Sequence, residues 1–333
     1  MRFIAALTLL LLVPALSAQE LDFVKPLSAI ERAPITSDTL GRMAGIPGFA
    51  QLQRPVTVGA YGGTVYLFDA GPNIFYRYDL YQETLQELPI ISAALKGAPA
   101  GITVAPDRSF YVADPAGRQV IHSSFDGQIL RILSDSANLA NPVATAFDPY
   151  TDNLLVADSL YDHIVGFNHE GWLLYGFGQR GMGPQQFQLI VGMASGPEGI
   201  YVVDRLNPFI KIYTPDGKFI YGFSRREVSN PAAIAVDWRD RIYVADNFDD
   251  TIKVYVKEKY VGEFGGTGSA LGRFRFITNL YINQNFLYVA DSMNGRIQVF
   301  IIDPLGAAKP QEKNSERPVV PNESPATEGV PAP

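Results

Sequence analysis

Short apolar runs that end in an aspartate recur along the chain. The clearest copy is Arg241–Asp246, which reads Arg-Ile-Tyr-Val-Ala-Asp, and similar runs end at five other aspartates. The six are Asp69, Asp114, Asp158, Asp204, Asp246 and Asp291. They are spaced 42 to 46 residues apart, and a fixed period in this range indicates a repeat architecture.

Each period contains the pattern of four short strands. The sixth residue after the aspartate is apolar in every copy, and the eighth is apolar in the last three copies. Since alternate residues of a strand share a face, this spacing predicts a strand with one buried face. Turns such as Asp126-Gly127 lead to another apolar run, and a strand often led by proline, as at Pro231, precedes each aspartate run. Four strands per period in six copies predict an all-β fold, a six-bladed β-propeller of four-stranded blades.

The two ends of the repeat region are complementary. The last blade stops after its third strand, at Ile302, and a spare strand-like segment lies at residues 21–27. A closed ring leaves no open sheet edge. We therefore expect residues 21–27 to supply the outer strand of the last blade and to close the ring.

The segments outside the repeats have their own compositions. Residues 1–18 combine Arg2, a short apolar run and small residues, which is typical of a secretory signal cleaved near Ala18. Residues 19–302 form the predicted propeller, and residues 303–333 are rich in Pro, Glu and Ser, which predicts a disordered tail. The chain has no cysteine. We expect an exported bacterial protein, periplasmic or extracellular, with no membrane span.

The repeated aspartates and the glycine-rich loops both invite a functional interpretation. An Asp at a strand end accepts hydrogen bonds from nearby main-chain groups, and a role repeated six times favours structure over a single active site. Residues 178–183 and 262–268 resemble phosphate-binding loops, but no Lys-Ser/Thr pair and no helix pattern follows. We expect these glycines to form tight turns leading to the buried aromatics Phe187 and Phe274.

The blade pattern resembles the NHL-repeat family over residues 21–302, and residues 231–255 carry the strongest likeness. That segment joins an Ala-Ile-Ala-Val-Asp strand, the Arg-Ile-Tyr-Val-Ala-Asp run and Thr-Ile-Lys-Val-Tyr. The family's frequent arginine five residues after the aspartate is present only as Arg296. The resemblance implies a propeller but leaves the activity open, because the family includes protein-interaction platforms, RNA binders and peptidylglycine amidating lyases.

Catalytic chemistry finds little support in the sequence. The three histidines, His122, His163 and His169, fall at different strand and turn positions, so they are not expected to share one zinc ion. Asp107, Asp148 and Asp237, which follow first strands, are candidate calcium ligands, but each borders a turn and a turn role is favoured. We expect no catalytic residue and no cofactor, with a structural calcium ion left open. The net charge of −7 argues against nucleic acid.

A binding surface is the leading functional hypothesis. The loops joining second to third strands, and those linking blades, share one face and carry arginines with apolar residues, a combination enriched at interface centres. The candidate residues are Arg180, Arg205, Arg225, Arg226, Arg273, Arg275, Arg296, Leu160, Tyr161, Leu206, Phe248 and Met293. We expect a monomeric scaffold module that holds a protein partner or an anionic ligand in the cell envelope. Solvated loops, a channel-metal hydrolase or lyase, and a structural component tethered by its tail are the alternatives.

Overall fold

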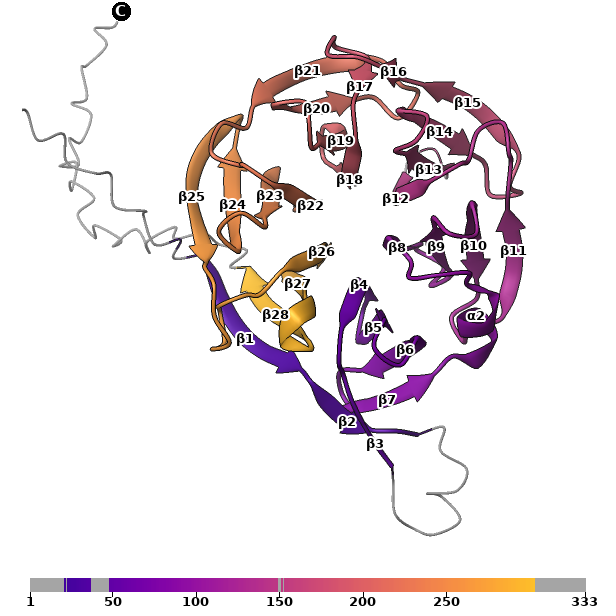
Figure 1. The fold of residues 1–333 in the computed structure, drawn as a ribbon, viewed down its shortest axis with the longest axis vertical. Helices are drawn as coiled ribbons and strands as arrows, with labels where there is room; N and C mark the ends of the chain where they lie inside the picture. The colour runs from indigo at the N-terminus through magenta and orange to yellow at the C-terminus, as the bar shows by residue number, and fades with distance from the viewer. Residues whose placement is uncertain (1–20, 22, 37–47, 149–150, 152, 303–333) are drawn as a thin grey trace, which may run out of the picture.

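Six four-stranded antiparallel sheets stand in a ring around a central axis (Figure 1). The structure, a computed structural model, describes residues 21, 23–36, 48–148, 151 and 153–302. The expected signal segment 1–18 and tail 303–333 lie outside the described residues. The six-bladed propeller predicted from the repeat is confirmed.

The strands follow the repeat in chain order. Blade one is β4 (Pro55–Tyr61), β5 (Thr64–Asp69), β6 (Ile74–Asp79) and β7 (Thr84–Glu87). Blade two is β8 (Gly101–Val104), β9 (Phe110–Asp114), β10 (Gln119–Ser123) and β11 (Ile129–Leu133). Blade three is β12 (Pro142–Asp148), β13 (Asn153–Asp158), β14 (His163–Phe167) and β15 (Leu173–Phe177). Blade four is β18 (Ile190–Gly196), β19 (Gly199–Asp204), β20 (Phe209–Tyr213) and β21 (Phe219–Ser224).

The last two blades complete the ring. Blade five is β22 (Pro231–Val236), β23 (Arg241–Asp246), β24 (Thr251–Val256) and β25 (Lys259–Gly265). Blade six is β26 (Ile277–Asn283), β27 (Phe286–Asp291), β28 (Arg296–Ile302) and β1 (Val24–Ile30). The strand β1 pairs antiparallel with β28, from Val24 opposite Ile302 to Ile30 opposite Ile297. The ring is therefore closed by an N-terminal strand, as expected, although this strand lies three residues later than the predicted segment.

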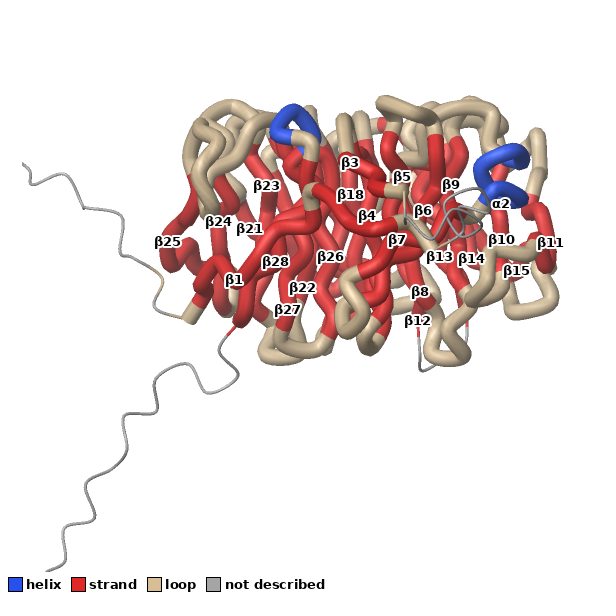
Figure 2. Tube along the Cα trace, turned by 90° about the horizontal axis from the view of Figure 1, so that it is seen from below, coloured by secondary structure: helices blue, strands red, loops and turns tan. Residues whose placement is uncertain are grey.

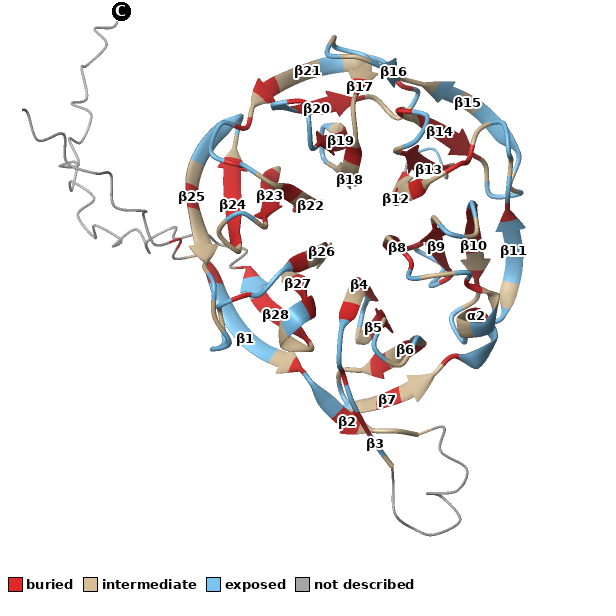
Figure 3. Ribbon diagram, viewed as in Figure 1, coloured by how far each residue is buried: buried red, intermediate tan, exposed pale blue. Residues whose placement is uncertain are grey.

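The core lies between the blades. Each of six apolar clusters joins side chains of two neighbouring blades, including one across the closure between blades six and one. The sixth residue after each aspartate, from Phe75 in blade one to Ile297 in blade six, is fully buried in these layers. Burial is highest on the middle strands, whereas the outermost strands carry many exposed residues (Figure 3).

Smaller elements decorate the connections. They are β2 (Arg32–Pro34), β3 (Phe49–Gln51), α2 (Pro89–Ala94), β16 (Gln179–Arg180), β17 (Gln186–Phe187) and η1 (Ser292–Asn294). The glycine-rich stretches form turns as expected. Gly178 and Gly265 both have positive φ, and a Cβ at either position would collide with the ring of Phe187 or Phe274. Both rings are fully buried.

The two faces of the ring are built differently. Each second strand ends at its aspartate, and the loop that enters each blade lies at the same end of the sheet, because the strands alternate in direction. We call this side, which carries α2 and η1, the Asp face (Figure 2, upper side). No helix in the described part of the chain is long and apolar enough to cross a membrane.

Candidate functional site

The strand-terminal aspartates hold the Asp face together. Asp69 accepts hydrogen bonds from the main-chain N–H groups of Gln53 and Arg54, both at 2.7 Å, in the loop that enters its blade. It also accepts one from the N–H of Gly71 in its own turn, at 3.0 Å. The other five aspartates are likewise buried and accept at least one such bond from their entry loops. The structural role expected for this repeated acid is confirmed.

This turn presents the second residue after each aspartate to solvent. In blades three to six that residue is apolar, and its exposed fraction is 61% for Leu160, 58% for Leu206, 76% for Phe248 and 62% for Met293. The N–H groups of Leu160, Leu206 and Phe248 each donate to the preceding aspartate at 2.9–3.0 Å, so the same turn supports these three. We call the four residues the apolar arc. Blades one and two have only glycine and alanine at this position.

Exposed arginines flank the apolar arc. Arg180, Arg205, Arg226, Arg273 and Arg275 are all exposed, and all lie in Asp-face loops of blades three to six. Tyr161 is exposed beside Leu160. The Arg180 Nε lies 3.9 Å from a carboxylate oxygen of Asp162, and an Nη of Arg273 donates to the carbonyl of Gly265 at 2.6 Å. Among the described residues, none accepts a hydrogen bond from the guanidinium groups of Arg205, Arg226 and Arg275. The structure therefore brings five of the seven predicted arginines onto one face with exposed apolar side chains.

Arg225 does not belong to that surface, and the expectation that it lies there is wrong. Its side chain is only 5% exposed and donates to four main-chain carbonyls. These are the carbonyls of Asn207 at 3.2 Å and of Val228, Asp204 and Arg205 at 2.8 Å. The guanidinium fork thus joins the turn after β19 to the loop that enters blade five. Its role in the structure is to hold these two loops.

Arg296 is also buried, so its expected place on the binding surface is wrong too. Its Nε donates to the Asp291 carboxylate at 2.8 Å, and one Nη donates to the carbonyls of Ala270 and Arg273 at 2.9 and 3.0 Å. In blade two Gln119 takes the same position and donates to Asp114 at 2.8 Å. In blades two and six the residue five places after the aspartate therefore supports both the aspartate and the entry loop.

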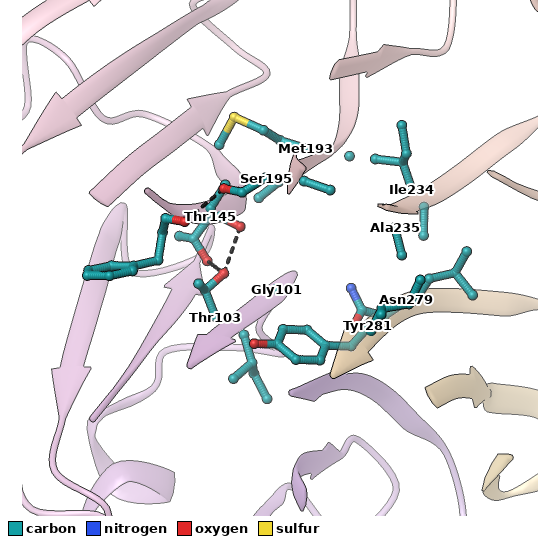
Figure 4. A pocket seen from close by; sticks show the side chains of 18 of the residues that line it. Gly101, Thr103, Thr145, Met193, Ser195, Ile234, Ala235, Asn279 and Tyr281 are labelled. Carbon is teal, nitrogen blue, oxygen red and sulfur yellow. Dashed lines mark hydrogen bonds between the residues drawn. The ribbon is translucent and has the colours of Figure 1, made fainter. Parts of the chain in front are cut away.

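A central channel crosses the ring between the first strands of the blades (Figure 4). It encloses a cavity of about 310 Å³. The lining residues are small or apolar with a few neutral polar side chains, and no Asp, Glu, His, Lys or Arg of the described chain is among them. A metal-dependent hydrolase or lyase would need carboxylate or histidine ligands at the channel, so the described lining gives that alternative no support.

The other candidate ligands are engaged elsewhere. Asp107 accepts from the Ser109 N–H at 2.8 Å, and Asp237 accepts from the Arg241 N–H at 2.9 Å and pairs with its Nε at 2.5 Å. Asp148 accepts from the Thr151 hydroxyl at 2.5 Å. These are the turn roles favoured from the sequence. Within the described ranges, no three His, Cys, Asp or Glu side chains are grouped as a metal site.

The three histidines lie in separate environments. His122 stacks on Tyr111 with ring centroids 4.1 Å apart, and its Nε2 lies 2.9 Å from the Ser109 hydroxyl. His163 bonds the carbonyl of Asn138 through Nε2 at 2.7 Å, and His169 lies 2.7 Å from Glu170 in an exposed turn. Burial lowers the pKa of His122. Their separation agrees with the sequence-based expectation.

Two surfaces were not anticipated from the sequence. The first is the outer wall of blades two and three, where a groove of about 580 Å³ is lined partly by Ile132, Trp172 and Leu173. The exposed side chains there include Trp172, at 72%. The second is the wall of the central channel formed by β26, which carries Asn279 and Tyr281. A comparison of equivalent strand positions across blades would have revealed the second surface.

Solved structures share this fold. No family model and no curated protein sequence matches the chain. A protein of unknown function from Bacteroides thetaiotaomicron superposes with a TM-score of 0.60 at 14% identity, over 84% of this chain and 75% of that one. Virginiamycin B lyase from Staphylococcus aureus gives 0.58 at 11% identity, over 84% and 99% of the two chains. A streptogramin B lyase gives 0.55 at 12% identity, over 75% and 93%.

These likenesses concern the fold. At such low identities a shared propeller does not carry an activity from one chain to another. Membership of the NHL-repeat family also stays a prediction, since it rests on the blade motifs alone. The chain is a six-bladed β-propeller whose function must be argued from its own surfaces.

Proposed function

We propose that this protein is an exported propeller that binds a protein partner through the Asp face of blades three to six. The observation that carries the proposal is the apolar arc, four large exposed side chains presented by equivalent turns of consecutive blades. Aromatic residues, Met and Arg are enriched at interface centres, whereas scattered single apolar side chains need no explanation. Repetition in four neighbouring blades distinguishes this arc from scattered exposure.

Binding through this surface needs the arginines as well as the apolar arc. Fully burying a Leu, Phe or Met side chain contributes about 1.5–3 kcal/mol, so the arc supplies roughly 6–12 kcal/mol. Association costs an estimated 4–15 kcal/mol in lost translational and rotational freedom. The arc alone therefore gives weak binding at best. The guanidinium groups of Arg205, Arg226 and Arg275, which donate no hydrogen bond to any other described residue, can add hydrogen bonds to acidic groups of a partner.

Charge predicts the character of the partner surface. The chain as a whole carries −7, yet the charged side chains predicted for the interface are arginines. Complementary charge at an interface rim speeds association and makes it sensitive to salt. We therefore expect the partner to present carboxylates around an apolar centre. A scaffold role of this kind is also one of the functions found among the NHL-repeat proteins that the sequence resembles.

Export is the second part of the proposal and rests on residues 1–18. A charged residue, a short apolar run and small residues at the end form the pattern of a cleaved signal. N-terminal sequencing of the protein isolated from an envelope fraction is expected to begin near Gln19. A protein that retains Met1 and fractionates with the cytoplasm would contradict export without affecting the argument for the binding face.

Site-specific photo-crosslinking in cells tests the binding proposal. A photoreactive amino acid placed at Phe248 is expected to capture one defined partner. The same amino acid at Trp172 serves as the control, because Trp172 is equally exposed but lies on the outer wall of blade three. Crosslinks at Trp172 alone, or identical unspecific patterns at both positions, would count against the Asp face.

A further inference from the structure

The channel wall formed by β26 differs from the walls formed by the other five first strands. In each blade the first strand pairs with the second strand, which ends at the repeated aspartate. The first-strand residues opposite the first and the third residue before that aspartate are therefore equivalent in all six blades. In blades one to five these positions hold only Gly, Ala or Thr. In blade six they hold Asn279, opposite Ala290, and Tyr281, opposite Tyr288. Two large polar side chains thus replace small ones around the channel.

Both side chains extend from β26 toward the cavity, as Figure 4 shows. The Asn279 Oδ1 accepts a hydrogen bond from the N–H of Val58 at 3.2 Å, so the NH₂ group of the same amide is the part that can donate to a ligand. The Tyr281 hydroxyl oxygen accepts the N–H of Val104 at 3.3 Å, so its own proton points elsewhere. Within the described chain, neither the Asn279 NH₂ group nor the Tyr281 O–H donates a hydrogen bond, since both side chains are found only as acceptors. The wall therefore offers unused donors to whatever occupies the cavity.

The hydroxyl groups across the channel are already engaged. The Thr103 hydroxyl donates to the carbonyl of Thr145 at 2.7 Å and lies 2.8 Å from the Thr145 hydroxyl. The Ser195 hydroxyl donates to the carbonyl of Phe147 at 2.8 Å. Elsewhere the lining includes the apolar side chains of Met193 on β18 and Ile234 on β22. The wall formed by β26 thus donates hydrogen bonds, and the rest of the lining is mostly apolar.

We propose that the central channel binds a compact, uncharged molecule that bears a carbonyl group, held by hydrogen bonds from Asn279 and Tyr281. A cavity of about 310 Å³ is at the small end of ligand pockets. The NH₂ group of Asn279 and the O–H of Tyr281 favour a ligand with an acceptor oxygen, and Met193 and Ile234 contact the apolar part of that ligand. Among the described residues no charged side chain lines the cavity, so an anion or a cation would lose its hydration without gaining a partner of opposite charge.

The protonation state of Tyr281 agrees with the proposal of an uncharged ligand. Burial raises the pKa of Tyr281 to about 12, so its hydroxyl keeps the donated proton throughout the physiological range. In the part of the chain that the structure describes, no Asp, Glu, His, Lys or Arg side chain lines the channel. Binding is therefore expected to be independent of pH from 6 to 9.

The test uses three probes of similar shape on the full protein: N-cyclohexylacetamide, cyclohexanecarboxylate and cyclohexylammonium. The amide is expected to bind at least tenfold more tightly than either ion in an NMR titration. Tyr281→Phe and Asn279→Ala are each expected to weaken the amide about tenfold, because each removes a donor. Ser195→Ala is the matched control and is expected to stay within twofold of the parent, because its hydroxyl is engaged with the wall.

A second measurement makes the test independent of how well the variants fold. The full sequence has only five methionines, so the methyl signals of labelled protein are few, and the bound amide is expected to show an intermolecular nuclear Overhauser effect to the Met193 methyl group. Absence of that effect at saturating amide would overturn the proposal. Equal affinity for amide and carboxylate, an unchanged affinity in both donor variants, or no binding at all would overturn it too.

Discussion

Replacing Arg225 tests whether a buried arginine, and not only apolar packing, holds the Asp face. Arg225→Met keeps an unbranched stem of similar volume to the arginine stem and removes the guanidinium from four carbonyl groups at 2.8–3.2 Å. The adjacent Arg226→Met is the control. It removes the same charge from an exposed side chain, so any effect of net charge is the same in both variants.

The magnitude follows from the contacts. A hydrogen bond from a charged donor contributes about 1.5–3 kcal/mol, so four independent bonds would sum to at least roughly 6 kcal/mol. Two effects reduce this sum. Burial lowers the pKa of Arg225, which means that the folded state holds this charge at a desolvation penalty, and water can reach loop carbonyls once the side chain is gone. We therefore expect a loss of about 3–4 kcal/mol, in the range for removing one member of a buried polar group.

Urea denaturation followed by far-UV circular dichroism measures this loss directly. Arg226→Met is expected within about 0.5 kcal/mol of the parent. At roughly 2–4 °C per kcal/mol for a chain of this size, Arg225→Met should also melt about 10 °C earlier. If the two variants differed by less than about 1 kcal/mol with equal m-values, the four contacts would not stabilise the fold and the reasoning would be refuted.

Three further predictions concern stability. Asp246→Asn should cost about 2–4 kcal/mol, because the amide NH₂ faces main-chain N–H groups that the carboxylate now accepts at 2.8–3.0 Å; Asp216→Asn in an exposed turn should be neutral in the same urea titration. Deleting residues 21–30 removes β1 and opens blade six, so the melting temperature should fall by more than about 10 °C, and an unchanged value would refute ring closure by this strand. The folded-state pKa of His122 lies below its usual 6.5, so its contribution to stability is present above pH 6.5 and is lost as the pH falls through the lowered value. His122→Gln should therefore flatten the acid limb of the stability curve, whereas His169→Gln should leave it unchanged.

The repeat made the fold predictable. Six aspartates at a near-constant spacing, with apolar residues at fixed offsets, define the strands, the number of blades and the missing outer strand of blade six. The role of each aspartate was predictable as well, because one residue type repeated at one position must satisfy the same local geometry in every blade. Closure of the ring by the N-terminal segment was predictable too, because the last blade has only three strands in its own repeat and a spare strand-like segment precedes the first blade.

The placement of individual arginines was not predictable in the same way. Arg225 lies in a loop where its neighbours Arg226 and Ser224 are at least partly exposed, and only the three-dimensional course of the two loops brings four carbonyls around it. The donors that hold the loops differ from blade to blade, with Gln119 in blade two, Arg225 after blade four and Arg296 in blade six, so no single repeat position reveals the role. Asn279 and Tyr281 are the opposite case, since aligning the six first strands exposes them as departures from the small residues of the other blades.

The affinity of the crosslinked partner for matched surface variants tests the central claim most directly. Leu206→Glu with Phe248→Glu places two charges in the apolar arc, and Trp172→Glu places one on the outer wall. The account predicts that the Asp-face double variant weakens binding at least about 100-fold, while Trp172→Glu leaves the dissociation constant within twofold. Full affinity in the double variant, or loss of binding with Trp172→Glu alone, would contradict it.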